Sequence, residues 1–382
     1  MKYSVYQHWD PLKVCIVGRS YTPEFYHFIK NDRVRTVMER IARETEEDYQ
    51  KLIELLESFN IEVLRPNVSD DYTDYLRDGK ISPPPMTPRD YSIMLGDNFY
   101  FQSQDVYEAS KKVWDYVRGS DWPMNFPTSK EEFDCLPEEI KQELFNIINN
   151  NTTNDWDAVL EKIKKHANVF YRIDRGMSGL NSAMTTRIGK DLYFGTDAHG
   201  SESITLVQQV KNFHPEYRYH IVDTGGHSDG TFCPVVPGLI VSLKDIPTYA
   251  DTFPGWEVIY LPGQSWKKVK PFLELKRKNH GKWWVPGEEL NDDFTNFVEE
   301  WLGHWVGYVE ETVFDVNMLV IDRHNVVCNN YNKEVFEAFE RHGITPHMVN
   351  FRHRYFWDGG LHCITSDVHR EGTMEDYFPE RG

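Results

Sequence analysis

The sequence predicts one closed α/β domain in which five related units surround a central axis. A pattern of two short apolar strands, an amphipathic helix and a closing strand recurs along the 382 residues. No linker separates the copies, and each copy alone would leave an apolar face uncovered. We therefore expect a single pseudo-symmetric domain, 1–382, whose units pack against one another in a ring.

The elements of each copy follow from hydrophobic periodicity, because period 2 predicts strands and period 3.6 predicts helices. The first copy contains a strand at 14–17, a helix at 34–59 and a strand at 63–65. The second contains strands at 92–95 and 99–101 and a helix near 106–117. The third copy contains a strand ending at Ile188, a strand at 192–194, a helix at 201–213 and a strand at 219–222. The fourth contains strands within 234–241 and at 256–260. The fifth contains strands at 317–321 and 326–328, a helix at 333–341 and a strand at 347–350.

Two segments depart from the repeat. Residues near 103–175 contain extra helices, and residues near 263–305 are rich in Trp and Lys, so both are interpreted as insertions. In a closed ring, insertions of this kind are expected to lie over one end of the central axis. There the aromatic-rich insertion near 263–305 is the candidate for excluding water from a site. A surface decoration is the equally plausible alternative.

Composition excludes several classes of function. The net charge of −18 disfavours nucleic acid and anionic membrane surfaces as partners and favours a cationic substrate. No apolar run of membrane-spanning length occurs, and the N-terminus has no apolar signal core. Five cysteines, odd in number and widely spaced, indicate a reducing compartment, so we expect a cytoplasmic protein. A homodimer is compatible with the sequence.

A candidate nucleophile lies near the C-terminus, in Gly359-Gly360-Leu361-His362-Cys363. Two glycines let the backbone approach a ligand, and a thiol can act as a nucleophile if a base and a substrate-holding group lie nearby. The neighbouring His362 is expected to point away, into packing or backbone contacts. The histidines around Cys363 lack the short ligand pairs of a zinc site, so we expect no metal there. We expect no organic cofactor either, because a nucleophile and charged groups that hold the substrate suffice.

Other polar residues fall at matching phases of the repeat. Asp90 opens one unit, Asn181 precedes the next, and His227 and Asp229 precede another, whereas Cys363 follows the last. Loops at one end of a ring would bring these residues together around the axis. Taken singly, Asp90 and Asp229 could be turn residues and His227 an exposed loop histidine.

Taken together, these segments resemble the amidinotransferases of the pentein superfamily, which modify guanidino groups, and in particular glycine amidinotransferase and the inosamine-phosphate amidinotransferases. The resemblance spans nearly the whole chain in the family's order and implies a five-bladed α/β propeller. Its segments are Trp9-Asp10-Pro11-Leu12, Ile16-Val17-Gly18-Arg19, Pro88-Arg89-Asp90, Gly189-Lys190-Asp191, His227-Ser228-Asp229-Gly230-Thr231-Phe232, Pro237-Gly238-Leu239-Ile240-Val241-Ser242, Gly359-Gly360-Leu361-His362-Cys363 and Asp367-Val368-His369-Arg370-Glu371-Gly372-Thr373.

The resemblance implies roles for four residues. Cys363 would be the nucleophile, His227 the general acid and base, and Asp90 and Asp229 the groups that hold the guanidinium. The chemistry asks for those types, because a planar cation with five donors can be held at its edges by carboxylates while its face stays open to sulfur.

Four positions depart from the family's pattern and would shape substrate choice. Asn181 stands where most relatives have an acidic residue, and an amide cannot stabilise an imidazolium by charge. Lys244 is the local basic residue where glycine amidinotransferases use an arginine to hold the donor carboxylate. Glu310 and Glu311 replace small residues and would favour a more cationic donor or acceptor than glycine.

The function predicted from the sequence is transfer of an amidino group from arginine, or a close analogue, to a primary amine. The predicted cycle is ping-pong through an amidino-Cys363 intermediate and yields ornithine and a guanidino compound. Its partners would be small molecules only: an arginine-like donor and an amine acceptor. A guanidino-group hydrolase is the first alternative, and a non-catalytic guanidine-binding protein is the second.

Overall fold

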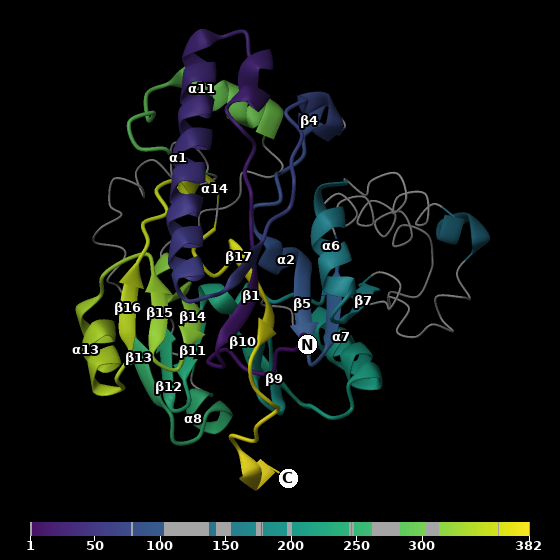
Figure 1. Ribbon diagram of the computed structural model, residues 1–382, viewed down its shortest axis with the longest axis vertical. Coiled ribbons are helices and arrows are strands. Elements are labelled where there is room, and N and C mark those ends of the chain that lie inside the picture. The colour runs from purple at the N-terminus through teal and green to yellow at the C-terminus, as the bar shows by residue number, and fades with distance from the viewer. Residues whose placement is uncertain are drawn as a thin grey trace.

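The computed structural model describes residues 2–77, 79–102, 137–142, 154–172, 177, 179–196, 201–243, 246, 248–261, 283–302, 313–357 and 359–381. Five three-stranded sheets surround a common centre, and a long helix rises beside one end of the ring (Figure 1). The predicted five-bladed α/β propeller is thereby confirmed. The helix predicted near 106–117 lies outside the described residues.

The five sheets share one topology. In each, the first strand pairs antiparallel with the second, and the second pairs parallel with the third. Parallel neighbours need a crossover connection, and helices supply it. The sheets are β17 (Thr365–Arg370), β1 (Leu12–Val17) and β2 (Glu62–Leu64); β5 (Ser92–Leu95), β6 (Asn98–Phe101) and β7 (Asn168–Tyr171); β8 (Thr185–Ile188), β9 (Asp191–Thr196) and β10 (Arg218–Asp223); β11 (Phe232–Val236), β12 (Leu239–Ser242) and β13 (Glu257–Tyr260); and β14 (Leu319–Asp322), β15 (Asn325–Cys328) and β16 (Thr345–Met348).

Helices fill the crossovers, and shorter elements lie between the sheets. The crossover helices are α1 (Asp32–Ser58), α6 (Asp157–Lys164), α7 (Ser201–Phe213), α8 (Tyr249–Thr252) and α13 (Lys333–Arg341). The other elements are η1 (Glu24–Phe28), η2 (Tyr72–Tyr75), β3 (Leu76–Arg77), β4 (Lys80–Ile81), α2 (Pro88–Tyr91), η3 (Asn154–Trp156), η5 (Ser228–Gly230), α11 (Asp292–Phe297), η6 (Val298–Leu302), α12 (Val313–Val316), α14 (Arg354–Trp357) and η7 (Pro379–Arg381).

Two strands differ from the sequence-based expectation. β7 lies inside the segment 103–175 that was interpreted as an insertion, yet it completes the sheet of β5 and β6. β17, close to the C-terminus, pairs with β1 close to the N-terminus and closes the ring. The nucleophile candidate therefore immediately precedes the strand that joins the two ends of the chain.

The long helix α1 begins and ends where local chemistry dictates. The Asn31 side chain caps its N-terminus by accepting hydrogen bonds from the backbone of Arg33 and Val34. Apolar residues at helical spacing, including Met38, bury one face in the largest hydrophobic cluster. After the last turn Asn60 adopts a left-handed backbone, with φ of 57°, which ends the helix.

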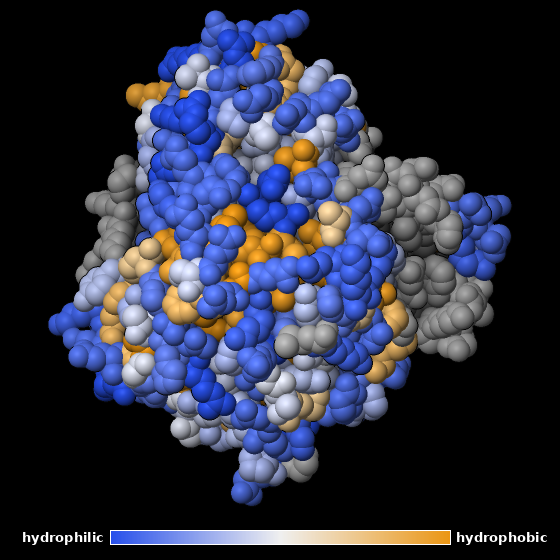
Figure 2. All heavy atoms as spheres, viewed as in Figure 1, coloured by the Kyte–Doolittle hydropathy of each residue, from blue (hydrophilic) through white to orange (hydrophobic). Residues whose placement is uncertain are grey.

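Surface character agrees with the composition. Hydrophilic residues cover most of the face in Figure 2, while an apolar area lies near its middle, between α1 and α6. Within the described ranges, no helix combines the length and apolar character that crossing a bilayer requires.

Candidate active site

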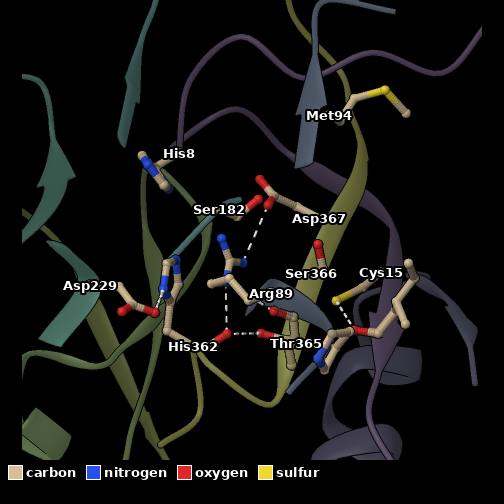
Figure 3. Close-up of polar contacts among 12 residues, drawn as sticks. His8, Cys15, Arg89, Met94, Ser182, Asp229, His362, Thr365, Ser366 and Asp367 are labelled. Atoms are coloured by element: carbon tan, nitrogen blue, oxygen red, sulfur yellow. Dashed lines mark hydrogen bonds and ion pairs between the residues drawn. The ribbon is translucent and has the colours of Figure 1, made fainter. Parts of the chain in front are cut away.

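The turn that carries Cys363 is held against the segment that carries Asp90. Arg89, on α2, is fully buried, and its Nε donates hydrogen bonds to the carbonyl oxygens of His362 (2.8 Å) and Thr365 (2.9 Å). Figure 3 shows this guanidinium inside the turn, with a further contact to Asp367. Because Asp90 follows Arg89 directly, the nucleophile and the first carboxylate are positioned by one set of contacts.

Asp229 provides a second carboxylate beside the sulfur. It lies on η5, where its backbone nitrogen donates to the carbonyl oxygen of Ala183 at 3.2 Å. Its Oδ2 lies 2.9 Å from His362 Nδ1 and 3.5 Å from Cys363 Sγ, and the side chain is buried. The ring of His362 points at this carboxylate in Figure 3.

Asn317, two residues before β14, binds both the nucleophile turn and Asp229. Its Oδ1 accepts hydrogen bonds from the backbone nitrogens of His362 (2.8 Å) and Cys363 (3.0 Å). Its Nδ2 donates to Cys363 Sγ (3.0 Å) and to the Asp229 carbonyl oxygen (3.2 Å). One buried amide thus connects two segments and touches the candidate nucleophile.

His227 lies at the more open side of the site. Its Nδ1 is 3.9 Å from Asp90 Oδ1, and the exposed fractions are 51% for the His227 side chain and 26% for that of Asp90. Behind Asp90, Arg172 donates from Nη1 to the Asp90 carbonyl oxygen at 3.3 Å. The imidazole is therefore accessible to a substrate while still close to a carboxylate.

Each of the two carboxylates keeps one buried oxygen available. Neither Asp90 Oδ1 nor Asp229 Oδ1 has a hydrogen-bond partner within the described part of the chain. Buried carboxylate oxygens without donors are costly, so a ligand that supplies N–H groups and positive charge would be bound well.

Burial and charge set the protonation of the site. Burial, followed by the charges of Asp229 and Asp90, raises the pKa of Cys363 well above its ordinary value. Burial also raises the pKa of Asp90, with His227 opposing the rise. Burial alone would raise the pKa of Asp229, but the hydrogen bond from His362 and nearby positive charge lower it overall. Burial and Arg89 lower the pKa of His362 to about 4.

A small cavity lies beside Asp229, which is one of its lining residues. His8 and His362 line it together with buried apolar side chains, and their ring centroids are 5.8 Å apart. Among the described residues, no group of three or more His, Cys, Asp or Glu side chains is arranged to hold a metal ion.

The structure brings together four of the residues singled out from the sequence, namely Cys363, His227, Asp90 and Asp229. The Asn181 side chain makes local bonds instead, accepting from the Met184 nitrogen at 2.8 Å and donating to the Gly179 carbonyl oxygen at 3.3 Å. Those bonds stabilise the turn at 181–184, which packs against η5. The remaining three candidates, Lys244, Glu310 and Glu311, lie outside the described residues.

Two residues correct or extend the prediction. His362 was expected to point away from the site, and this is wrong, because its Nδ1 bonds to Asp229. Asn317 was placed only at the start of a strand. The sequence shows only an asparagine next to an apolar strand. The structure buries this side chain, and a buried polar side chain needs partners.

Comparison with solved structures identifies the fold. An amidinotransferase of Microseira wollei from the saxitoxin biosynthetic pathway superposes with a TM-score of 0.60 and 15% identity, covering 98% of this chain and 99% of that one. The inosamine-phosphate amidinotransferase StrB1 of Streptomyces griseus gives 0.58 and 16%, with the same coverage. The fold is therefore that of the pentein amidinotransferases.

Sequence comparison reaches particular relatives. The mitochondrial glycine amidinotransferase of Xenopus tropicalis is 23% identical over 408 residues, covering 98% of this chain and 84% of that protein. The L-arginine:L-lysine amidinotransferase of Pseudomonas savastanoi pv. phaseolicola is 21% identical over 203 residues, 52% of this chain and 46% of that protein. No protein-family model matches the chain. The chain is thus a homologue of the amidinotransferases, which confirms the predicted resemblance and the prediction of an enzyme.

Proposed function

We propose that this protein is an amidinotransferase that moves the amidino group of arginine, or a close analogue, to a primary amine through a covalent intermediate on Cys363. One observation carries the proposal: Cys363 Sγ lies 3.5 Å from Asp229 Oδ2, beside two carboxylates that each keep a buried oxygen without a hydrogen-bond partner among the described residues. The amidinotransferase relatives support the same chemistry.

A guanidinium fits this arrangement better than other cations do. It is planar, permanently charged and carries N–H donors on its edges, so Asp90 Oδ1 and Asp229 Oδ1 can each accept from a different edge. Held in this way, its central carbon presents one face to the sulfur. An ammonium ion offers no such flat face and no electrophilic carbon.

Donor binding would also activate the thiol. Burial, followed by the charges of the two acids, raises the pKa of Cys363, so without a donor the sulfur is held as a thiol. A bound guanidinium neutralises part of this negative field and favours the thiolate, which is the attacking species. Cys363 would therefore become reactive mainly when a donor is present.

The first half-reaction conserves charge and protons. Neutral His227 takes the proton of the Cys363 thiol, and the sulfur attacks the guanidino carbon. The bond from this carbon to the alkyl nitrogen breaks, and His227 returns the proton to that nitrogen, which leaves as an amine. With arginine as donor the amine is ornithine, and the cationic amidino group stays on sulfur.

The second half-reaction runs the same steps in reverse with another amine. The acceptor nitrogen attacks the amidino carbon, the carbon–sulfur bond breaks, and the proton lost by the acceptor passes through His227 to the sulfur. Water must be excluded during this step, because its attack would give urea.

The redox state of the cysteines fits a cytoplasmic protein. Among the described residues Cys15, Cys233, Cys328 and Cys363 are all free thiols, as a reducing cytoplasm would maintain them.

The proposal is tested by trapping the intermediate. The enzyme is incubated with arginine without acceptor and quenched in acid, and the mass of the peptide containing Cys363 is measured by mass spectrometry. We expect that peptide to gain one amidino group, with about one equivalent of ornithine released. The Cys363→Ala variant should show neither, and Cys328→Ala, which removes a buried thiol from β15, should behave as wild type.

Other products would identify the rival functions. Citrulline and ammonia, or ornithine and urea, formed in continuous turnover from arginine alone would indicate a hydrolase. Donor binding without labelling of Cys363 would indicate a binding protein. If the label forms, glycine, lysine, putrescine and aminocyclitols are then compared as acceptors by the mass of the guanidino product.

A further inference from the structure

We propose that Asn317 is a further catalytic residue, whose side-chain amide stabilises the Cys363 thiolate both when it attacks and when it leaves. The proposal rests on the proposed function, because it assigns Asn317 a part in amidino transfer. It starts from the 3.0 Å hydrogen bond between Asn317 Nδ2 and Cys363 Sγ.

The orientation of this amide is fixed by its neighbours. The atom that faces the backbone nitrogens of His362 and Cys363 must be the oxygen, because backbone N–H groups only donate. The NH₂ group therefore occupies the other side, where it has one hydrogen for the Asp229 carbonyl oxygen and one for the sulfur. A flipped amide would present donors to two donors, and the side chain is fully buried.

The surroundings of the sulfur make this donor important. Burial and the charges of Asp229 and Asp90 all disfavour the thiolate. The amide of Asn317 and a backbone hydrogen bond from Gly360 act in the opposite direction. Since the two carboxylates are needed to bind a guanidinium, a neutral donor is the means of stabilising sulfur without repelling the cationic substrate.

The backbone leaves room for this contact at one glycine. A Cβ atom built on Gly360 would lie 2.5 Å from Asn317 Oδ1 and 2.9 Å from Asn317 Cβ. Any other residue at 360 would push the amide away from the turn. The glycine pair noted in the sequence thus allows the close approach of Asn317 as well as that of a ligand.

In the reaction the same hydrogen bond acts twice. When the thiol proton has passed to His227, the sulfur carries negative charge until the bond to carbon forms, and Asn317 donates to it. When the acceptor nitrogen displaces the sulfur, the electron pair of the carbon–sulfur bond returns to Cys363, and Asn317 stabilises the departing thiolate. A preorganised donor of this kind needs no rearrangement between the steps.

The test is the variant Asn317→Asp, which has nearly the same shape. Its Oδ1 can still accept from both backbone nitrogens, but a carboxylate oxygen replaces the NH₂ beside the sulfur. The rate of Cys363 alkylation by iodoacetamide is measured against pH, together with kcat and the donor Kd. We expect the alkylation profile to move to higher pH by about one unit or more and kcat to fall about 10²-fold, with donor affinity preserved.

Because the new carboxylate also adds negative charge beside the sulfur, the profile is recorded on Asn317→Ala as well, which removes the donor without adding charge. A purely structural role predicts that in Asn317→Ala stability and donor affinity fall together and the alkylation profile does not move. That result, with circular dichroism and urea midpoints as folding controls, overturns the assignment. If Asn317→Asp fails to fold, the profile of Asn317→Ala decides by itself. Absence of amidino labelling in the wild-type enzyme instead overturns the proposed function, so the two failures are distinguishable.

Discussion

At the scale of single residues, His362 determines how Asp229 meets a substrate. The pKa of His362 is lowered to about 4, so its ring is neutral near pH 7. The carboxylate of Asp229 can only accept, so the shared proton must be on His362 Nδ1. This bond occupies Oδ2 and leaves Oδ1 for the guanidinium. His362 is therefore a positioning residue that acts through Asp229.

Replacing His362 should move the acid limb of the activity profile. The hydrogen bond from His362 lowers the pKa of Asp229, so its loss raises that pKa, and Asp229 becomes protonated at higher pH. For His362→Ala we expect the acid limb of kcat/KM for the donor to shift upward by about one pH unit, or ~1.4 kcal/mol. His362→Asn, whose amide nitrogen can replace Nδ1, should shift it less. An unmoved limb in His362→Ala would contradict this role.

The sequence could identify residues whose side chains are reactive or charged, but not residues whose role depends on which groups they contact in the folded protein. A thiol, an imidazole and two carboxylates at matching phases of a repeat indicated Cys363, His227, Asp90 and Asp229. Asn317 is chemically inert, and its role depends on meeting a turn from another part of the chain. The direction of the His362 ring was equally invisible, because it is set by the position of η5.

At the scale of elements, the turn before β17 is shaped by two adjacent glycines with different surroundings. A Cβ on Gly360 would collide with Asn317, at 2.5 Å from its Oδ1. A Cβ on Gly359 would lie 3.2 Å from Thr87 Cγ2, a side-chain methyl group that would have to give way by only a few tenths of an ångström. The two positions therefore form a matched pair.

We expect Gly360→Ala to displace Asn317 and Gly359→Ala to be tolerated. The clash at 360 should destabilise the protein by about 1–3 kcal/mol, as overpacking of a buried site does, and should lower kcat more than tenfold through the lost contact to sulfur. Urea unfolding and steady-state kinetics on both variants measure the effects. Equal behaviour of the two variants would show that the space at Gly360 does not matter.

Strands with local partners could be predicted, whereas two with remote partners could not be assigned. β8, β9 and the helix between β9 and β10 follow one another directly, so periodicity was enough. β7 is separated from β6 by a long segment, and its four residues carry a weak pattern. β17 finds its partner at the other end of the chain, which hydrophobic alternation alone cannot reveal.

At the scale of the whole molecule, a buried charge cluster ties the ring together beneath the site. Asp367 on β17 accepts from Arg187 (2.7 Å), Arg370 (2.8 Å) and Arg89 (3.3 Å). Arg187 also reaches the carbonyl oxygen of Met94 on β5, and Arg370 reaches that of Val320 on β14. The cluster thereby joins four of the five sheets at the centre.

Because three buried guanidinium groups share one carboxylate, Asp367→Asn should destabilise the fold strongly, by about 3–5 kcal/mol in urea unfolding at pH 7. Burial would raise the pKa of Asp367, but the three arginines hold it well below its ordinary value. The stability that the ionised Asp367 contributes is therefore fully present above the pKa of this group in the unfolded state. The difference in free energy of unfolding between wild type and Asp367→Asn should therefore be equal at pH 7 and pH 5, and it should become smaller only below about pH 4. The control is Asp32→Asn, whose exposed pair with Arg35 should contribute less than about 1 kcal/mol. Equal stability of Asp367→Asn and wild type would mean that packing alone, without this ion cluster, keeps the ring closed around the nucleophile turn.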